Sequence, residues 1–526
     1  MSRPIFALCL ALLLPAAAVA QPIDQDNAGA LQHDLQSWFA GLLGPHLGAA
    51  EQRLRVTPED DHFHVVLPFA DATGQNTISA DVRPLPGGRW SVDALHLPAA
   101  SRFTLSMPQP GNPPGPPVPT HFDLHIGSQQ AHALFDPALS SPSRLDIDLG
   151  DVGLETDSAR QQQLQHFDRY ALHATLQPEP GQGEPGQPDP GQAVPGQPTS
   201  GQPDSGPPAQ ARPGQPRPRQ ERLDLVQRGT ITGWRTASRV GDKPAIGFGA
   251  DSIQANCRID GIDSTHATAL LTAANGMLAT LPPAAAQGGH MALSAPARAA
   301  LRALIESLRN IITGVQGEET INGLHIAVAG RGEATVHRVS LGLTGAAPDG
   351  MLHATLNVDL DGLTVADLPP AAIALVPRHL ALQPSVSGIS LAALTTLALA
   401  ATEQDVNHAQ LQADTDALWA QGRTTIGLDA LDMDIGSATL HGHGQVRLTG
   451  PHEYDARGHI TATGLDTLIL QAAGNPDLQQ ALPLLAMARG FARQEGDHLV
   501  WDIVANRAGL TVNGVPLGGQ PQPERR

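Results

Sequence analysis

The chain is poor in cysteine, aromatic residues and positive charge, and each shortage excludes a class of function. Its 526 residues include only two cysteines, which excludes a framework of several disulfides. Aromatic residues make up 3% of the sequence, so platforms for stacking bases or sugars are few. Acidic residues number 51 against 32 lysines and arginines. The resulting net charge of -19 disfavours docking on nucleic acid or on anionic lipid headgroups.

The sequence also lacks the residue spacings of common catalytic sites. It contains no G-x-S-x-G, H-E-x-x-H, P-loop, dinucleotide fingerprint or EF-hand pattern. We therefore expect a protein that is not an enzyme and needs no cofactor, and we assign no catalytic or cofactor-binding residue. A hydrolase with an unrecognised site is the less favoured alternative.

Residues 1–20 have the layout of a secretory signal peptide. A positive start precedes the apolar run Ile5–Leu14, and Ala18-Val19-Ala20 forms a cleavage site before Gln21. We expect export to a bacterial periplasm, with no transmembrane segment after cleavage, because no later apolar run is long enough. Cleavage removes Cys9 and leaves Cys257, which we expect to be a small buried hydrophobic residue in a strand.

Alternation of apolar and polar residues is the strongest pattern in the chain. In Met351–Val365 (MLHATLNVDLDGLTV) the even-numbered residues from Leu352 to Leu360 are apolar, and the intervening residues are polar. A period of two predicts a strand with one face buried. Similar runs recur, and stretches of helical spacing lie between them at Asn27–Leu47, Thr265–Leu281, Ala297–Ile312, Leu368–Leu375, Leu391–Thr402, Leu468–Ala473 and Leu478–Gln494. We expect Asn27–Leu47 to cover the first sheet.

Three junctions suggest a domain-sized repeat. Gly261, Gly362 and Gly464 lie roughly 100 residues apart, and each follows an alternating run and precedes a helical stretch. Glycine can adopt the backbone angle that ends a strand sharply. We therefore predict an α+β fold, mostly β, made of repeated twisted antiparallel sheets with covering helices.

The predicted domain organisation follows composition. After the signal peptide, residues 21–255 form a β-rich N-terminal region, residues 256–517 a C-terminal β/α repeat region, and residues 518–526 a disordered tail. Pro178–Gln220 consists of PGQ-like units that cannot bury enough apolar surface to fold. Because strand-like segments flank this run closely, we interpret it as a disordered insertion at an exposed loop. A shorter proline-rich loop is predicted at Pro108–Thr120.

Four runs of the sequence carry a family resemblance. They are HFDLHIGSQQAHALFDPALSSPSRLDIDL, GTITGWRTASR with DSIQANCRIDGID, LPPAAIALVPRHLALQPSVSG and GLTVNGVPL. Through them the chain resembles the DUF2125 family of exported alphaproteobacterial proteins, and the likeness covers about Leu31 to Leu517 except the insertion. The resemblance implies an exported, β-rich protein and carries no site residues. At the level of fold, the strands and the T-x-N-G hairpin are also similar to AsmA/YdgA-type envelope proteins, which implies lipid handling by analogy only.

Two histidine pairs are the nearest approach to a metal site. His62 and His64 share a face of an extended chain, as do His441 and His443, and either pair could bind zinc or copper with a third ligand from elsewhere. A solvated polar strand face is the favoured interpretation, so we assign no metal ligand. The same holds for Asp359 and Asp361 as paired carboxylates.

The amphipathic strands point to two functions. If the helices leave part of the apolar sheet faces uncovered, a groove between sheet and helices would bind a lipid or another apolar ligand, in a role in envelope homeostasis. The alternative is a periplasmic scaffold that contacts other envelope proteins through Pro178–Gln220 and exposed sheet edges.

Overall fold

The structure is a computed structural model. It describes residues 22–517, with the exception of residues 34, 37–52, 72–73, 87–88, 110–114, 137–140, 159–160, 179–221, 242, 264–294, 309–312, 331, 348–349, 369, 374, 402–407, 421–423, 451–452 and 475–481. The predicted signal peptide, most of the proline-rich insertion, the helix expected at Thr265–Leu281 and the C-terminal tail lie outside the described residues.

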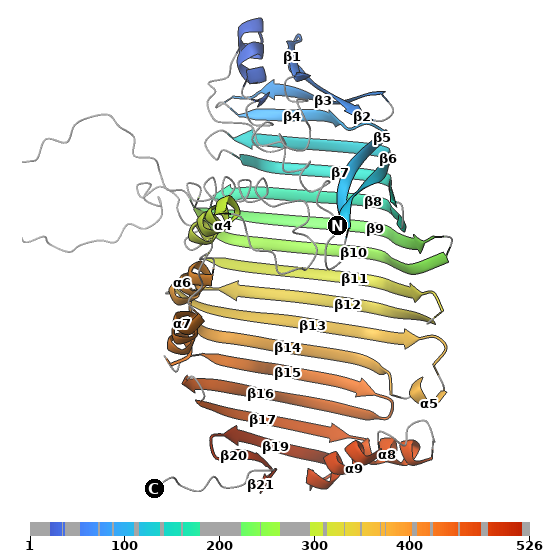
Figure 1. Cartoon of the computed structure of the whole chain (residues 1–526), viewed down its shortest axis with the longest axis vertical. Helices are drawn as coiled ribbons and strands as arrows, with labels where there is room; N and C mark the ends of the chain where they lie inside the picture. Colours follow the sequence, from blue (N-terminus) through green and yellow to red (C-terminus); the bar gives the residue numbers. More distant parts are fainter. Residues whose placement is uncertain are drawn as a thin grey trace, which may run out of the picture.

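One antiparallel sheet of 21 strands contains most of the described chain (Figure 1). Its strands are β1 (Arg55–Pro58), β2 (Phe63–Asp71), β3 (Gly74–Pro84), β4 (Trp90–His96), β5 (Ala100–Gln109), β6 (Gly115–Asp136), β7 (Ser141–Ser158), β8 (Gln161–Pro178), β9 (Arg222–Val240), β10 (Lys243–Asp263), β11 (Gly314–Val328), β12 (Gly332–Ala346), β13 (Met351–Val365), β14 (Pro377–Ser390), β15 (Thr425–Ile435), β16 (Ala438–Gly450), β17 (Glu453–Thr463), β18 (Arg493–Glu495), β19 (His498–Asn506), β20 (Gly509–Val512) and β21 (Val515–Pro516). The labelled helices are α4 (Ala295–Leu308), α5 (Pro370–Ile373), α6 (Leu391–Ala401), α7 (His408–Ala420), α8 (Leu465–Ala473) and α9 (Leu482–Phe491). The predicted α+β, mostly β class is confirmed.

The strands form a single meander, where separate repeated sheets were expected. Every strand from β6 to β16 pairs with the next one in the chain, and β17 pairs with β19. The division expected between residues 255 and 256 falls inside β10, and the sheet continues through it. The proline-rich insertion joins β8 to β9, which pair directly at its ends, with Pro178 opposite Leu223. It therefore connects two neighbouring strands of one sheet. Strand β6 begins at Gly115, inside the loop expected at Pro108–Thr120.

The helices agree with the sequence patterns in place and differ in length. Residues 25–33 are helical, and Ala28, Leu31 and Leu35 are buried in a cluster with strands β1–β4. This is the expected cover of the first strands. Helix α6 lies where Leu391–Thr402 was predicted, whereas only the four residues of α5 are helical in Leu368–Leu375. Residues 493–495 of the last predicted helix form β18 instead.

A row of left-handed residues crosses the middle of the sheet, and we call it the crease. Its positive-φ members are Asp151 (φ 51°), Gly233 (61°), Gly323 (62°) and Gly362 (67°), in strands β7, β9, β11 and β13. Each shifts the alternation of its strand by one residue. In β13, for example, apolar residues change from even to odd numbers after Gly362. A left-handed residue inside a strand kinks it, in the manner of a β-bulge.

Each left-handed residue of the crease packs against the neighbouring strand. A Cβ built on Gly233 would lie 1.9 Å from Asp168 Oδ2, and one on Gly323 would lie 2.1 Å from Asp251 Oδ2. A Cβ on Gly362 would lie 2.7 Å from His337 Cβ. These close approaches require glycine in β9, β11 and β13. The sequence therefore specifies the bend through a glycine in alternate strands.

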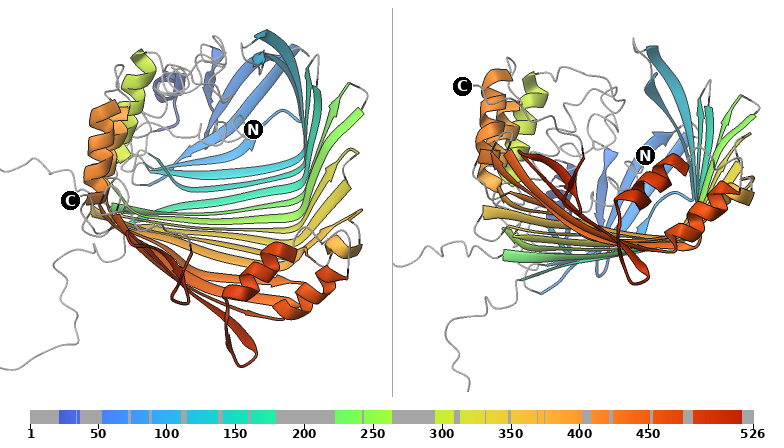
Figure 2. Two further views of the ribbon diagram at one scale, coloured as in Figure 1. Left: turned by 60° about the horizontal axis from the view of Figure 1, so that its bottom comes forward. Right: turned by 90° about the horizontal axis from the view of Figure 1, so that it is seen from below.

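The crease gives the sheet an angular cross-section. Figure 2 shows the middle strands running along a floor and turning upward at the end where β7 connects to β8 and β9 to β10. Helices α4, α6 and α7 stand along the opposite border, and α8 and α9 lie over the C-terminal strands on the same inner side. The sheet therefore has a concave face, bordered by the upturned strand ends and by helices.

Candidate functional site: the concave apolar face

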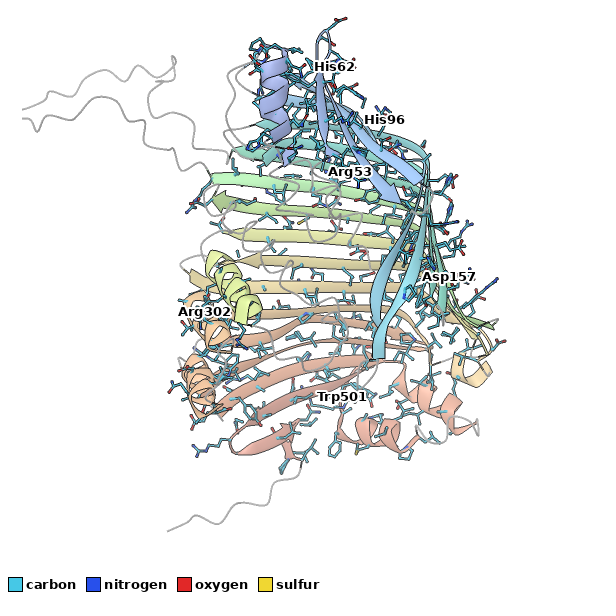
Figure 3. All side chains as sticks on the ribbon, turned by 45° about the horizontal axis from the view of Figure 1, so that its top comes forward. Arg53, His62, His96, Asp157, Arg302 and Trp501 are labelled. Carbon is cyan, nitrogen blue, oxygen red and sulfur yellow. The ribbon has the colours of Figure 1, made fainter. Side chains whose placement is uncertain are left out.

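Trp501 of β19 identifies the residues that face the concave side. Its indole Nε1–H donates a hydrogen bond of 2.8 Å to the carbonyl oxygen of Ala488 in α9, which lies on that side (Figures 2 and 3). Residues directly opposite one another in an antiparallel sheet share a face. Following the register from Trp501 across the sheet gives the row Ile460, Gly442, Leu431, Leu382, Val358, Leu341, Glu319, Ala255, Gly229, Leu172, Ile147 and Ala131.

This row and the row beside it are almost entirely apolar. Glu319 is the single charged residue of the first row. The adjacent row contains no charged residue and comprises Leu499, Ala462, Leu440, Met433, Leu380, Leu360, Val339, Ile321, Ile253, Ile231, Tyr170 and Leu149. The concave face is therefore a continuous apolar surface from β6 to β19.

The two ends of this face are covered, and its middle is exposed. At the N-terminal end the helix at residues 25–33 closes over β1–β4, and at the C-terminal end Leu465 and Leu468 of α8 pack on Leu499. In between, large apolar side chains of β12, β13 and β15 keep more than a third of their surface: Leu341 (36%), Leu343 (46%), Leu356 (40%) and Ile426 (45%). On the upturned wall, Ile246 and Phe248 are exposed by 40% and 38%. Exposed apolar side chains gathered on one face are a candidate surface for contact with a ligand, a membrane or another protein.

The opposite, convex face carries the charged residues. On it, Arg169 Nε donates to Asp148 Oδ1 at 2.8 Å, and this hydrogen bond lowers the pKa of Asp148. A hydrogen bond with His459, 2.8 Å long, likewise lowers the pKa of Asp502. Both pairs are solvent-accessible and join neighbouring strands on the convex face.

The histidines predicted as weak metal candidates separate into two environments. His441 and His443 lie on the convex face, where His441 hydrogen-bonds Asp432 and the His443 ring lies 5.5 Å from the ring of His459. His62 and His64 lie at the start of β2, and their ring nitrogens and a carboxylate oxygen of Glu59 all fall within 4.8 Å of one another. Among the residues that the structure describes, this is the one group of three such ligands.

The remaining candidates lie on opposite faces of the sheet, and Cys257 is less buried than expected. Asp359 and Asp361 share the convex face of β13, and Asp361 lies 3.5 Å from His337. Cys257 faces the concave side on β10, opposite Gln227 and Gly317, and is half-buried. Burial raises the pKa of its thiol, which disfavours the nucleophilic thiolate.

Comparisons with protein-family models, with curated proteins and with solved structures find no match. Within the described residues, no helix combines the length and the apolar character that crossing a membrane requires.

Proposed function

We propose that this chain is a non-catalytic, exported protein that binds the acyl chains of a lipid, or another elongated apolar ligand, across the middle of its concave face. The observation that carries the proposal is the exposure of Leu341, Leu343 and Leu356 within an apolar surface that continues under cover at both ends. Covering those side chains with hydrocarbon would gain roughly 25 cal/mol for each Å² removed from water.

The middle of the sheet suits hydrocarbon better than a peptide. Strands β10 to β15 are hydrogen-bonded on both sides, so they offer no free backbone edge to an added strand. With Glu319 as the single charge in the central row, a charged partner would also find little to pair with. An acyl chain needs neither kind of contact.

The dimensions also fit one extended acyl chain. At about 4.8 Å between neighbouring strands, the stretch from β10 to β15 spans roughly 24 Å. The hydrocarbon core of a whole bilayer is about 30 Å thick, so a single acyl chain reaches about 15 Å in a membrane and can lie entirely within the stretch of roughly 24 Å. The signal-like residues 1–20 and the resemblance to the DUF2125 family support a location in the periplasm, where such a protein would handle envelope lipids.

The test combines native mass spectrometry with titration. Protein purified from cells should carry extra mass that lipid extraction removes, and the stripped protein should bind a fluorescent long-chain fatty acid. Leu356→Glu should weaken that binding roughly tenfold or more, because it places a carboxylate in the apolar site. Asn357→Glu is the matched control, since Asn357 is the exposed neighbour on the convex face and should bind as the unaltered protein does.

A clean apo mass together with no binding of the fatty acid would refute the proposal. Equal weakening by Leu356→Glu and Asn357→Glu would show that the concave face is not the site. Retained partner proteins in place of lipid would favour the scaffold function instead.

A further inference from the structure

The turn between β1 and β2 gathers three metal-ligating side chains, those of Glu59, His62 and His64, and the neighbouring strand β3 adds a fourth, Asp81. The backbone N–H of Glu59 donates to the carbonyl oxygen of His62 at 2.8 Å, which closes the turn. This brings Glu59 Oε2 to 3.3 Å from His62 Nε2. On the neighbouring strand, Asp81 Oδ1 lies 2.8 Å from His64 Nδ1 and 3.5 Å from His62 Nε2.

We propose that Glu59, His62, His64 and Asp81 bind a divalent transition-metal ion, with Zn²⁺ as the best match. Two imidazoles and two carboxylates are a suitable donor set for zinc, which prefers four ligands in a tetrahedron. With metal–ligand bonds of about 2.0–2.1 Å, neighbouring ligand atoms of a tetrahedron lie about 3.3 Å apart. Three of the six separations, 2.8, 3.3 and 3.5 Å, are close to that value. Glu59, His62 and His64 form the group whose ligand atoms all lie within 4.8 Å of one another, and Asp81 stands beside that group, so its carboxylate would turn inward to complete the tetrahedron.

A second layer of contacts orients the ligands. Asp61 Oδ1 lies 2.9 Å from His62 Nδ1, and Arg83 Nε lies 3.3 Å from the other oxygen of Asp61. A carboxylate on one ring nitrogen fixes the tautomer in which the other nitrogen has a free lone pair, as in carboxylate–histidine–zinc triads. That free nitrogen, Nε2, is the one that faces Glu59 and Asp81.

The site stands on a rigid part of the molecule. Phe63, between the two histidines, is fully buried in the N-terminal core cluster, and the His62 side chain is only 15% exposed. Register places His64 directly opposite Asp81, so the β2–β3 pairing itself positions two of the ligands. Sites built on strands of a packed core hold their geometry better than sites on loops. A bound ion would tie the β1–β2 turn to β3.

The experiment uses the mature full-length protein after treatment with a chelator. Titration with ZnCl₂ by calorimetry should show one site per chain, and Co²⁺ in its place should give the intense visible absorption of tetrahedral coordination. His62→Ala/His64→Ala should weaken zinc binding by roughly 100-fold or more, because two of four ligands are removed. Asp61→Asn should weaken it by about 10- to 100-fold, the usual effect of removing an outer-layer partner.

The matched control is His441→Ala/His443→Ala, which removes two histidines at the same spacing from the convex face. It should leave zinc affinity unchanged. If the His62/His64 variant fails to fold, Glu59→Gln keeps the test valid, since the Glu59 side chain is 50% exposed and its loss should still weaken binding. No zinc binding, an octahedral Co²⁺ spectrum, or equal losses in the control and the His62/His64 variant would each overturn the proposal.

Discussion

Gly323 shows how much one residue of the crease constrains the sheet. Its φ of 62° is a conformation that other residues adopt at a cost of roughly 1–2 kcal/mol, and an added Cβ would meet Asp251 Oδ2 at 2.1 Å. Forcing atoms into such a contact adds roughly 1–3 kcal/mol. We therefore expect Gly323→Ala to lower the free energy of unfolding by about 2–4 kcal/mol, measured by chemical denaturation followed by circular dichroism.

A comparison with Gly330 separates the cost of the left-handed backbone from the cost of the clash. It has a similar φ of 72°, but a Cβ there meets nothing within 4 Å, so Gly330→Ala should cost only about 1 kcal/mol. Adding Asp251→Ala to Gly323→Ala should recover part of the loss, because it removes the carboxylate that causes the clash. If Gly330→Ala were as damaging as Gly323→Ala, the close packing of the crease would not matter.

The crease also explains where prediction from the sequence fell short. Alternation correctly identified the apolar residues on each side of the crease. A left-handed residue shifts the alternation by one position, however, so a single strand looks like two in the sequence. Asp146–Leu149 and Val152–Leu154, for example, look in the sequence like two short runs, but they belong to one strand, β7, with Asp151 between them. Gly261 and Gly362 have the expected positive φ, yet their strands continue beyond them. At the third junction, Gly464 follows the last residue of β17 and directly precedes α8, as expected.

The Asp148–Arg169 pair gives a prediction about pH at the same scale. Its hydrogen bond lowers the pKa of Asp148 below the ordinary 3.8, so the pair stabilises the fold above that pH and loses its effect as pH falls through the lowered pKa. Both side chains are solvated, which limits the effect to roughly 0.2–1 kcal/mol.

Asp148→Asn should therefore lower stability slightly between about pH 5 and pH 8, and its difference from the unaltered protein should vanish in strong acid. Urea denaturation across this pH range measures the difference. Arg169→Gln should remove the same contribution, and a double-mutant cycle isolates it. A difference that grows as pH falls would contradict this assignment.

At the scale of elements, the pairing of β8 with β9 predicts that the proline-rich insertion is dispensable for folding. Replacing residues 179–221 by a short Asn/Gly turn keeps the register in which Gln177 faces Asp224. The shorter loop should favour the fold by roughly 2 kcal/mol through a smaller closure entropy. We expect an unchanged or slightly higher melting temperature and unchanged binding of fatty acid.

Loss of fatty-acid binding in that variant would mean that the insertion takes part in the site. Loss of co-purifying proteins alone would support the scaffold alternative. The sequence indicated this arrangement because Tyr170–Leu176 and Leu223–Leu225 both alternate close to the insertion. Their direct pairing is a contact between distant residues, which no local pattern records.

The metal candidates also depend on a contact between distant residues that no local pattern records. The pair His62 and His64 was visible in the sequence, as was the equivalent pair His441 and His443. What distinguishes them is Asp81, which arrives from β3 through sheet register. The turn that folds Glu59 back onto His62 leaves no local pattern in the sequence, and β2 begins directly after it, at Phe63.

For the whole molecule, the decisive property is that one sheet keeps one apolar face across more than a dozen strands. The sequence predicts two-faced strands individually, since each alternates. Whether their apolar faces are covered depends on where helices fall, and the helices gather at the borders and ends of the sheet (Figures 1 and 2). Separate sheets with covering helices would have hidden these faces, whereas the continuous meander leaves the middle open.

An open apolar face predicts how affinity depends on the length of the ligand. Each methylene transferred from water into such a site contributes up to about 0.8 kcal/mol, or nearly fourfold in affinity. Saturated fatty acids of increasing length should therefore bind progressively more tightly, until the chain outgrows the roughly 24 Å between β10 and β15. Competition against a fluorescent fatty acid measures the series.

Introducing a charge at either end of the exposed stretch between β10 and β15 tests whether the apolar face itself sets the dependence on chain length. Phe248→Glu on β10 and Ile426→Glu on β15 should each shorten the apolar path, so they should weaken binding of the longest fatty acids more than that of short ones. Leu164→Glu is the control, because register with Glu155 places Leu164 on the convex face although it is 51% exposed. Affinity that does not change with chain length would mean that the headgroup, and not the apolar face, holds the ligand.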